Sequence, residues 1–239
     1  MTKNEPFQFT TGVIAYPLFF VLLIWIVYSI EINFNINFNS FGIYPRTIMG
    51  LRGILFSPFI HSGIKHLFNN TIPLYVLSAA LFYFYRSLSW KVLGFGLVFS
   101  GLLTWIIGRP SYHIGASGII YLLASFLFFK GIFSKYYRLV ALSLVVTFLY
   151  GGLFWYITPI DPEISWEGHL SGFLLGLLFS FIFKKQLPIV PKYDWEQPNF
   201  DEEQDDFMKH FDENGNFIEN ATLYQDFLEE KTSENKTEL

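Results

Sequence analysis

Side chains suited to acyl-transfer chemistry occur at three places in this sequence, each inside or beside an apolar run. Ser117 lies in a Gly-Ala-Ser-Gly run where one apolar segment begins, and His169 lies in another. His66 and Asn70 are four residues apart, so they share one face if their segment is helical. A hydroxyl, an imidazole and a pair of polar donors are the groups that acyl transfer needs. Gly-x-Ser-Gly alone is weak evidence, because small residues are common wherever transmembrane helices touch.

His169 is the candidate base for Ser117. A serine hydroxyl is a poor nucleophile until a base takes its proton, and the ordinary pKa of histidine, about 6.5, suits that task. Asp161, Glu163 and Glu167 precede His169, but Glu167, the nearest, is two residues away and points elsewhere on a helix. We therefore expect a Ser–His dyad and not a triad. The alternative is that His169 is only a polar contact between helices, although polar residues inside spans are costly and usually functional.

His66 and Asn70 are candidate donors to an oxyanion. Attack on a carbonyl creates a negative oxygen, and one preorganised donor aimed at it contributes roughly 3 kcal/mol. The backbone N–H groups of Ser117 and Ala116 would add to this set, since the start of a helix leaves such groups unpaired. The alternative is that His66 and Asn70 are a hydrogen-bonded pair that caps or anchors the preceding loop.

The remaining histidines and carboxylates favour no other catalytic class. We expect His61 to hydrogen-bond within its loop and His113 to be gating or solvated, and His210 has no assigned role. His61 and His66 do not form a His-Glu-x-x-His metal site, and the chain has no cysteine. A dyad of carboxylates is also excluded, because the membrane part has a single aspartate, Asp161, in a loop. We expect no metal and no cofactor.

Membrane spans are the elements predicted to position these residues. The 239 residues are 52% hydrophobic and only 15% charged, well below the roughly 25% charge typical of soluble domains. A span needs about 20 mainly apolar residues, and the first is expected to be retained, not cleaved as a signal. The predicted fold is an all-α, six-helix membrane bundle. Its spans are 12–30, 66–85, 90–107, 115–133, 139–157 and 168–183.

Two further segments complete the predicted organisation. Residues 31–65 are too polar and broken to cross, so we expect them to lie at the outer interface with an amphipathic stretch packed on the bundle. Residues 1–186 hold 12 Lys/Arg against 5 Asp/Glu, whereas 187–239 hold 4 against 15. We therefore predict a membrane domain, 1–186, followed by an acidic cytoplasmic tail, 187–239, largely disordered with one short helix near 220–231. No basic cluster interleaved with aromatic residues indicates nucleic-acid binding.

The distribution of Lys and Arg predicts the orientation. Eight lie near one set of span ends and four near the other, which places both termini in the cytoplasm. Ser117, His169 and His66 then all fall near the outer ends of their spans. This shared depth was not built into the charge count, and it supports a single site.

Small residues and one tyrosine favour a close approach of the fourth and sixth spans. Tyr121 is one turn after Ser117 on the same face, so its ring could stack under His169, although spacing alone equally allows one more aromatic contact. Glycines that recur every four residues let helices pack closely, which is compatible with both readings. These glycines are Gly168, Gly172 and Gly176 in the sixth span, with Gly115 and Gly118 in the fourth.

Taken together, these patterns resemble the rhomboid intramembrane serine proteases of the six-span bacterial form. The resemblance covers about residues 42–185. It rests on His-x4-His-x3-Asn at His61, His66 and Asn70, Gly-x-Ser-Gly at 115–118, Tyr121 four after the serine, and Gly-His-x-x-Gly-x-x-x-Gly from Gly168 to Gly176.

The resemblance implies the following expectations. Ser117 is the nucleophile, His169 the general base and Tyr121 its support, while His66, Asn70 and the Ser117 amide form the oxyanion hole. Other proteins' membrane spans are cut near their outer ends, at small residues with helix-weakening residues beyond them, and the fifth span and a loop act as a gate. The chain departs from the family where a further histidine often lies, at Ser57, and where alanine often precedes the catalytic histidine, at Gly168.

Three functional hypotheses follow. The first is an active serine endopeptidase in a multi-pass protein of the bacterial inner membrane, with transmembrane proteins as substrates. The second is a catalytically silent rhomboid-like protein that binds membrane-protein clients, although binding alone requires neither Ser117 nor His169. The third, a transporter or scaffold, leaves the shared depth of three polar groups unexplained.

Overall fold

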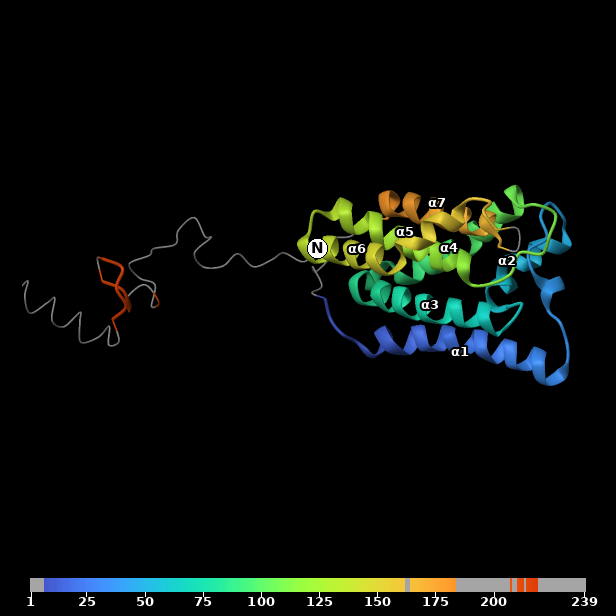
Figure 1. Ribbon diagram of the computed structural model, residues 1–239, viewed down its shortest axis with the longest axis horizontal. Helices are drawn as coiled ribbons and strands as arrows, with labels where there is room; N and C mark the ends of the chain where they lie inside the picture. The colour runs from blue at the N-terminus through green and yellow to red at the C-terminus, as the bar shows by residue number, and fades with distance from the viewer. Residues whose placement is uncertain (1–6, 162–163, 184–206, 208–209, 213, 219–239) are drawn as a thin grey trace, which may run out of the picture. The chain divides into compact units, whose positions relative to one another are not determined.

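The computed structural model describes residues 7–161, 164–183, 207, 210–212 and 214–218. The chain divides into two compact units, Met1–Pro188 and Ile189–Leu239, which are treated separately below. Within the described ranges the first unit is helical and contains no strand (Figure 1). Its longer helices are α1 (Thr11–Phe34), α3 (Ile64–Phe84), α4 (Arg86–Ile107), α5 (Ser117–Ser134), α6 (Tyr137–Tyr150) and α7 (Trp166–Ile182).

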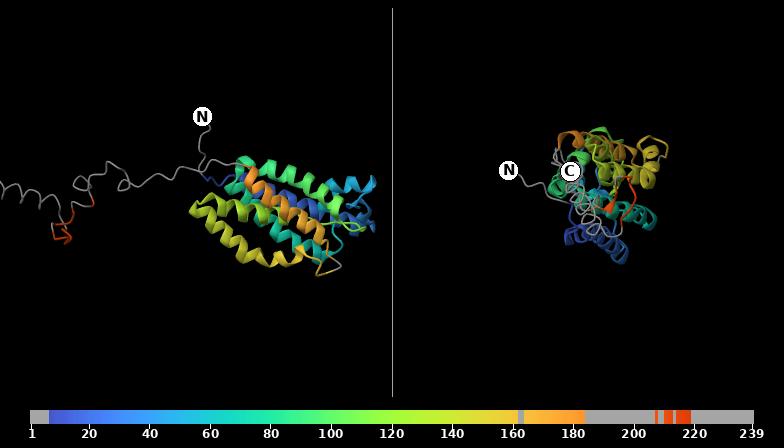
Figure 2. Two further views of the ribbon diagram at one scale, coloured as in Figure 1. Left: turned by 90° about the horizontal axis from the view of Figure 1, so that it is seen from above. Right: turned by 90° about the vertical axis from the view of Figure 1, so that its left-hand side faces the viewer.

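The fold is that of a multi-pass membrane protein. Of the described helices, α1, α3, α4, α5 and the stretch Tyr137–Ile157 are long and apolar enough to cross a bilayer. The last of these spans combines α6 with the 3₁₀ turns of η4 (Gly151–Ile157). The helices of this unit lie side by side, as the two views in Figure 2 show. Large apolar side chains such as Phe148, which is 88% exposed, cover the outside of the bundle and suit contact with lipid.

The sixth predicted span corresponds to α7, which is shorter than the others. It is an apolar helix of 17 residues, because the polar loop before Trp166 and the end of the helix at Ile182 limit it. The helical membrane fold is therefore confirmed, while the count of six crossings stays a prediction.

Helix α5 forms the centre of the bundle and α7 packs directly on it. Buried residues run along most of α5, including Leu122, Leu123 and Phe126. A Cβ added to Gly172 would collide with the Gly118 carbonyl, and one added to Gly176 would collide with the Leu122 carbonyl. The glycine stripe of α7 thus touches the backbone of α5, so the two helices approach more closely than side chains would allow.

The segment between α1 and α3 consists of short helices. They are η1 (Asn39–Phe41), η2 (Met49–Arg52), α2 (Gly53–Phe56) and η3 (Ser57–Phe59), and α2 packs on α4. Gly50 and Gly53 lie against the backbone of residues 42–44, where no Cβ would fit. Ile48, Met49 and Leu55 of this segment are exposed, so it has the apolar side chains that an interfacial position requires.

The second unit is described only around a tight turn. Phe211 and Phe217 form an isolated bridge, and the carboxylate of Asp212 accepts hydrogen bonds from the amides of Asn214 and Asn216. The helix predicted near 220–231 and most of the predicted disordered tail lie outside the described residues. The domain boundary at residues 186 and 187 stays a prediction.

Candidate active site

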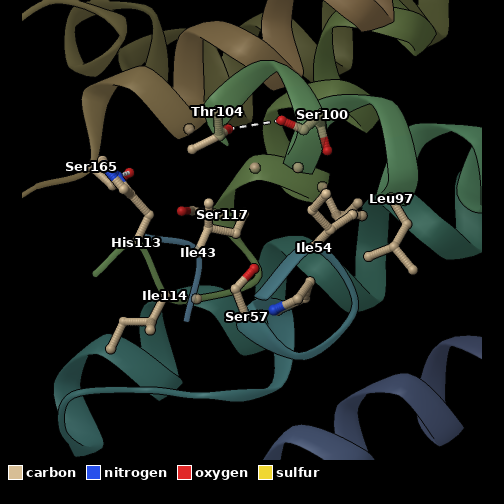
Figure 3. A pocket seen from close by; sticks show the side chains of 16 residues that line it. Ile43, Ile54, Ser57, Leu97, Ser100, Thr104, His113, Ile114, Ser117 and Ser165 are labelled. Carbon is tan, nitrogen blue, oxygen red and sulfur yellow. Dashed lines mark hydrogen bonds between the residues drawn. The ribbon is translucent and has the colours of Figure 1, made fainter. Parts of the chain in front are cut away.

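Ser117 is the first residue of α5 and follows a turn that requires glycine at position 115. Gly115 has a φ of 104°, a conformation that favours glycine, and its N–H donates to the Ser57 carbonyl at 2.8 Å. A Cβ at Gly115 would also lie 2.6 Å from His66 Nε2. Ser117 lines a small cavity with Ser57, Thr104 and other residues (Figure 3). The nucleophile candidate therefore lies at an accessible helix start.

Helix α7 brings His169 to the same end of α5. The Gly168 carbonyl lies 3.4 Å from the position that a Cβ on Gly118 would take, and Gly118 directly follows Ser117. The His169 ring stacks on the Tyr121 ring with centroids 4.1 Å apart and an interplanar angle of 10°. Because Tyr121 lies one turn after Ser117 on the same face of α5, the imidazole lies beside the face that carries the hydroxyl.

The imidazole of His169 is oriented by backbone and ring contacts. Its Nδ1 lies 2.9 Å from the Tyr156 carbonyl, and because a carbonyl only accepts, Nδ1 carries the proton and Nε2 is left as the basic nitrogen. The Tyr121 hydroxyl donates to the Leu153 carbonyl at 2.8 Å, which fixes the ring beneath. Among the described residues no hydrogen bond joins Ser117 to His169. Catalytic hydrogen bonds are often long without substrate.

His66 and Asn70 lie beside Gly115, two residues before Ser117. Asn70 is 5% exposed, and its Nδ2 has no hydrogen-bond partner among the described residues. The position of a Cβ on Gly115 would be 3.4 Å from this nitrogen. His66 Nδ1 lies 3.2 Å from Ser62 Oγ. A buried donor without a partner is costly, so Asn70 is a group that an arriving oxygen could satisfy.

Two loop histidines, His61 and His113, are buried in the structure. His61 is 3% exposed and packs on the His66 ring with centroids 5.0 Å apart, close to the Phe59 backbone of its own loop. Burial, and secondarily the nearby His66, lowers the pKa of His61 to about 4, while the Phe59 backbone opposes this weakly. His113 is also buried and contacts Ser165, so the solvated alternative was wrong, while the gating alternative stays a prediction.

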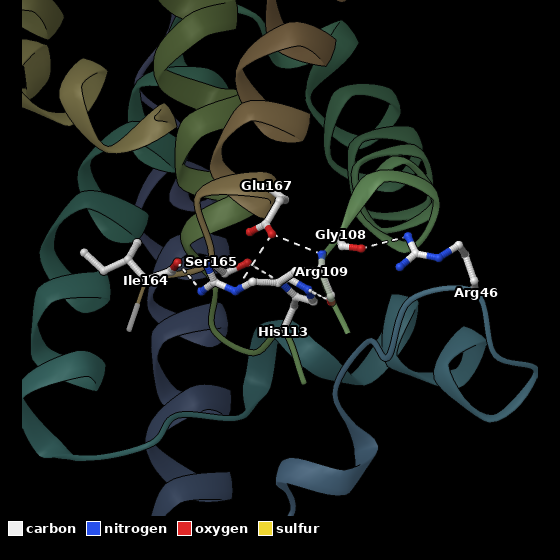
Figure 4. A network of polar contacts seen from close by, with 7 residues as sticks. All are labelled: Arg46, Gly108, Arg109, His113, Ile164, Ser165 and Glu167. Carbon is white, nitrogen blue, oxygen red and sulfur yellow. Dashed lines mark hydrogen bonds and ion pairs between the residues drawn. The ribbon is translucent and has the colours of Figure 1, made fainter. Parts of the chain in front are cut away.

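Sequence reasoning missed a polar network beside the site (Figure 4). Glu167 is 1% exposed, and its Oε1 accepts the backbone N–H of Arg109 at 3.1 Å. The Arg109 Nε lies 3.9 Å from the same oxygen. As expected, Glu167 makes its contacts away from His169. The sequence does carry one signal for this pair. Glu167 lies at the start of an apolar helix, and a carboxylate buried there is costly unless a cation such as Arg109 pairs with it.

Comparisons with known sequences identify a family and several relatives of this chain. The sequence model of the Rhomboid domain matches residues 50–186. The chain is 33% identical over 181 residues to an uncharacterized protein of Mycobacterium tuberculosis, covering 69% of this chain and 72% of that protein. It is 31% identical over 174 residues to an uncharacterized protein of Mycobacterium leprae, covering 69% of each chain. None of these names assigns an activity.

Proposed function

The chain belongs to the rhomboid family, and from that premise we propose that it is an intramembrane serine endopeptidase with a Ser117–His169 dyad. The observation that carries the proposal is the position of His169. Its imidazole is stacked on Tyr121 and bonded through Nδ1 to the Tyr156 carbonyl. This leaves Nε2 as the base at the end of α5 that carries Ser117.

In the proposed first step, Ser117 Oγ attacks the carbonyl carbon of a peptide bond and His169 Nε2 takes the hydroxyl proton. The tetrahedral oxyanion accepts hydrogen bonds from Asn70 Nδ2, His66 and the amides at residues 116 and 117. As the C–N bond breaks, His169 returns the proton to the leaving amine. An acyl group then remains on Ser117.

In the second step, water attacks the acyl carbon and gives a proton to His169. The tetrahedral intermediate collapses, the C–O bond to Ser117 breaks, and the proton passes back to Ser117 Oγ. The small cavity beside Ser117 is polar on several sides and could admit such a water. No metal or cofactor enters either step.

The proposed substrates are transmembrane segments of other proteins, cut near their outer ends. Ser117 and His66 lie at the starts of their helices, at the depth that the distribution of Lys and Arg assigns to the outer side. The same distribution supports cytoplasmic termini, and the resemblance to the six-span bacterial rhomboids supports six crossings and residence in the inner membrane of a bacterium. The acidic residues 187–239 would then form a cytoplasmic tail.

The competing proposal is a catalytically silent member of the family that binds membrane-protein clients. The observation that favours it is the absence, in the described part of the chain, of a hydrogen bond between Ser117 and His169.

Cleavage in reconstituted vesicles distinguishes the two proposals. The purified protein is mixed in proteoliposomes with a single-span substrate that carries small residues near its outer end, and products are identified by mass spectrometry. We expect one cut near the outer end, abolished in both Ser117→Ala and His169→Ala. No cleavage by the wild type across a panel of such spans would favour the silent protein.

A further inference from the structure

A pair of polar links joins the loop before Ser117 to the start of the helix that carries His169. In the first link, Glu167 accepts the Arg109 N–H at 3.1 Å and pairs with the Arg109 guanidinium. In the second, His113 Nδ1 lies 2.5 Å from Ser165 Oγ. We call these two links the loop clasp (Figure 4).

The two links reinforce one another through the backbone. His113 Nε2 donates to the Arg109 carbonyl at 3.1 Å, so His113 Nδ1 accepts from the Ser165 hydroxyl. Arg109 Nη2 donates to the Ile164 carbonyl at 2.8 Å. Residues 109 and 113 of the loop are therefore bonded to residues 164–167, immediately before His169.

The loop is also held on its other side. Arg46 Nη1 donates to the carbonyls of Ile106 and Gly108, and His113 exchanges two backbone hydrogen bonds with Ile43. The loop between α4 and α5 thus cannot move without breaking several hydrogen bonds, and those that His113 exchanges with Ile43 lie at buried residues, where their loss is costly.

The clasp acts at short range on both reacting groups. Arg109 is eight residues before Ser117, and Glu167 is two residues before His169. Below the site, the contact of Gly172 with the Gly118 backbone fixes how closely α5 and α7 approach. At the end of α5 that carries Ser117, the clasp joins the loop to the start of α7.

We propose that Glu167 is a positioning residue that, through Arg109 and with the His113–Ser165 link, sets the placement of Ser117 relative to His169. The inference rests on the proposed protease function. Because a misplacement of about 1 Å in a reacting group can cost on the order of 100-fold in rate, loss of the clasp reduces reaction at Ser117 more than it reduces binding.

The test measures the inactivation of the full-length protein in detergent by a fluorophosphonate, separating the limiting rate kinact from the half-saturating concentration KI. Glu167→Ala is expected to lower kinact between about 10- and 100-fold with KI changed less than about twofold. Glu167→Gln keeps an oxygen that can accept the Arg109 N–H, so it is expected to recover a substantial part of kinact.

Glu31→Ala is the matched control. Glu31 is also a buried carboxylate in the same unit, and its Oε1 accepts a loop N–H, that of Phe38, at 2.7 Å. The loop that contains Phe38 carries neither Ser117 nor His169. We expect Glu31→Ala to lower the thermal unfolding temperature without changing kinact more than about twofold.

A second variant covers the case in which Glu167→Ala does not fold. Ser165→Ala removes the other link and keeps the Arg109–Glu167 pair, and it is expected to lower kinact about threefold or more. If the wild type is labelled and the folded clasp variants keep its kinact, the positioning role of the clasp is wrong, while the proposed protease function stands. If the wild type is not labelled, the proposed protease function is wrong, and the positioning role of the clasp is wrong with it.

Discussion

At the scale of single residues, Asn70 is the clearest candidate for a group that acts only when a substrate oxygen arrives. Its buried Nδ2 has no partner within the described part of the chain, so Asn70→Ala removes a donor without breaking a hydrogen bond of the resting protein. We expect the kcat for span cleavage to fall about 100-fold, with little change in thermal stability.

Asn69→Ala is the control for this prediction. Asn69 neighbours Asn70 on α3 but is exposed, and its substitution should leave cleavage unchanged. If Asn70→Ala cleaves at the wild-type rate, Asn70 has no part in the mechanism.

His61 makes the stability of the protein depend on pH. Burial lowers its pKa to about 4, whereas the unfolded chain takes up this proton near the ordinary value of about 6.5. The unfolded state therefore binds more protons between about pH 6.5 and 4, and stability falls as pH falls through that window by at most about 1.4 kcal/mol per pH unit. Thermal unfolding in detergent from pH 7 to 4 measures this loss.

His61→Gln is expected to show a shallower loss of unfolding temperature over the same pH window, because the substituted side chain does not titrate. His113, whose pKa burial also lowers, still contributes, so the slope does not vanish. Equal slopes for the wild type and His61→Gln would contradict the assignment.

The contact between Tyr121 and His169 could be predicted from the sequence because it follows from helical spacing. Tyr121 shares a face of α5 with Ser117, and the ring stack with His169 needed only the close approach of two helices. His113 and Glu167 were different, because their partners lie more than 50 residues away along the chain. Contacts between loops do not follow the regular spacing of a helix or strand, so the sequence does not reveal them.

At the scale of helices, the crossing of α5 and α7 places the candidate residues Ser117 and His169 at the same end of the two helices. Gly172→Val places a branched side chain against the Gly118 backbone. We expect a loss of at least about 1–3 kcal/mol in the free energy of unfolding, the usual cost of overpacking, together with loss of cleavage as the helices separate.

Gly94→Val is the matched control for the crossing. Gly94 also lies inside a membrane helix, α4, but a Cβ there meets no atom within 4 Å. Thermal unfolding and cleavage should both stay near wild type for Gly94→Val. Equal behaviour of the two variants would mean that the close approach at Gly172 does not matter.

The extents of the helices were only partly predictable. Apolar runs identified every long helix of the bundle, because a lipid-exposed span must be continuous and apolar. The start of α7 and the change from α6 to 3₁₀ turns at Gly151 were not visible, since both depend on local hydrogen bonding. Between α1 and α3 the sequence predicted an amphipathic stretch packed on the bundle, but not its division into short helices, because backbone contacts at Gly50 and Gly53 determine them.

At the scale of the whole molecule, the membrane unit is expected to hold all of the catalytic groups. Every site residue lies between residues 57 and 172, and the match to the Rhomboid domain ends at residue 186. A chain truncated after residue 190 loses most of the acidic charge. We expect it to cleave a model span at the wild-type rate in proteoliposomes, and a folded but inactive truncation would contradict this.

The measurement that tests the central claim most directly is the mass and site of the adduct formed with a fluorophosphonate. The account predicts one adduct on the intact wild-type protein, mapped to Ser117, and no adduct in Ser117→Ala or in folded His169→Ala. Labelling of His169→Ala at the wild-type rate, or an adduct on any residue other than Ser117, would show that the two side chains do not work as a dyad.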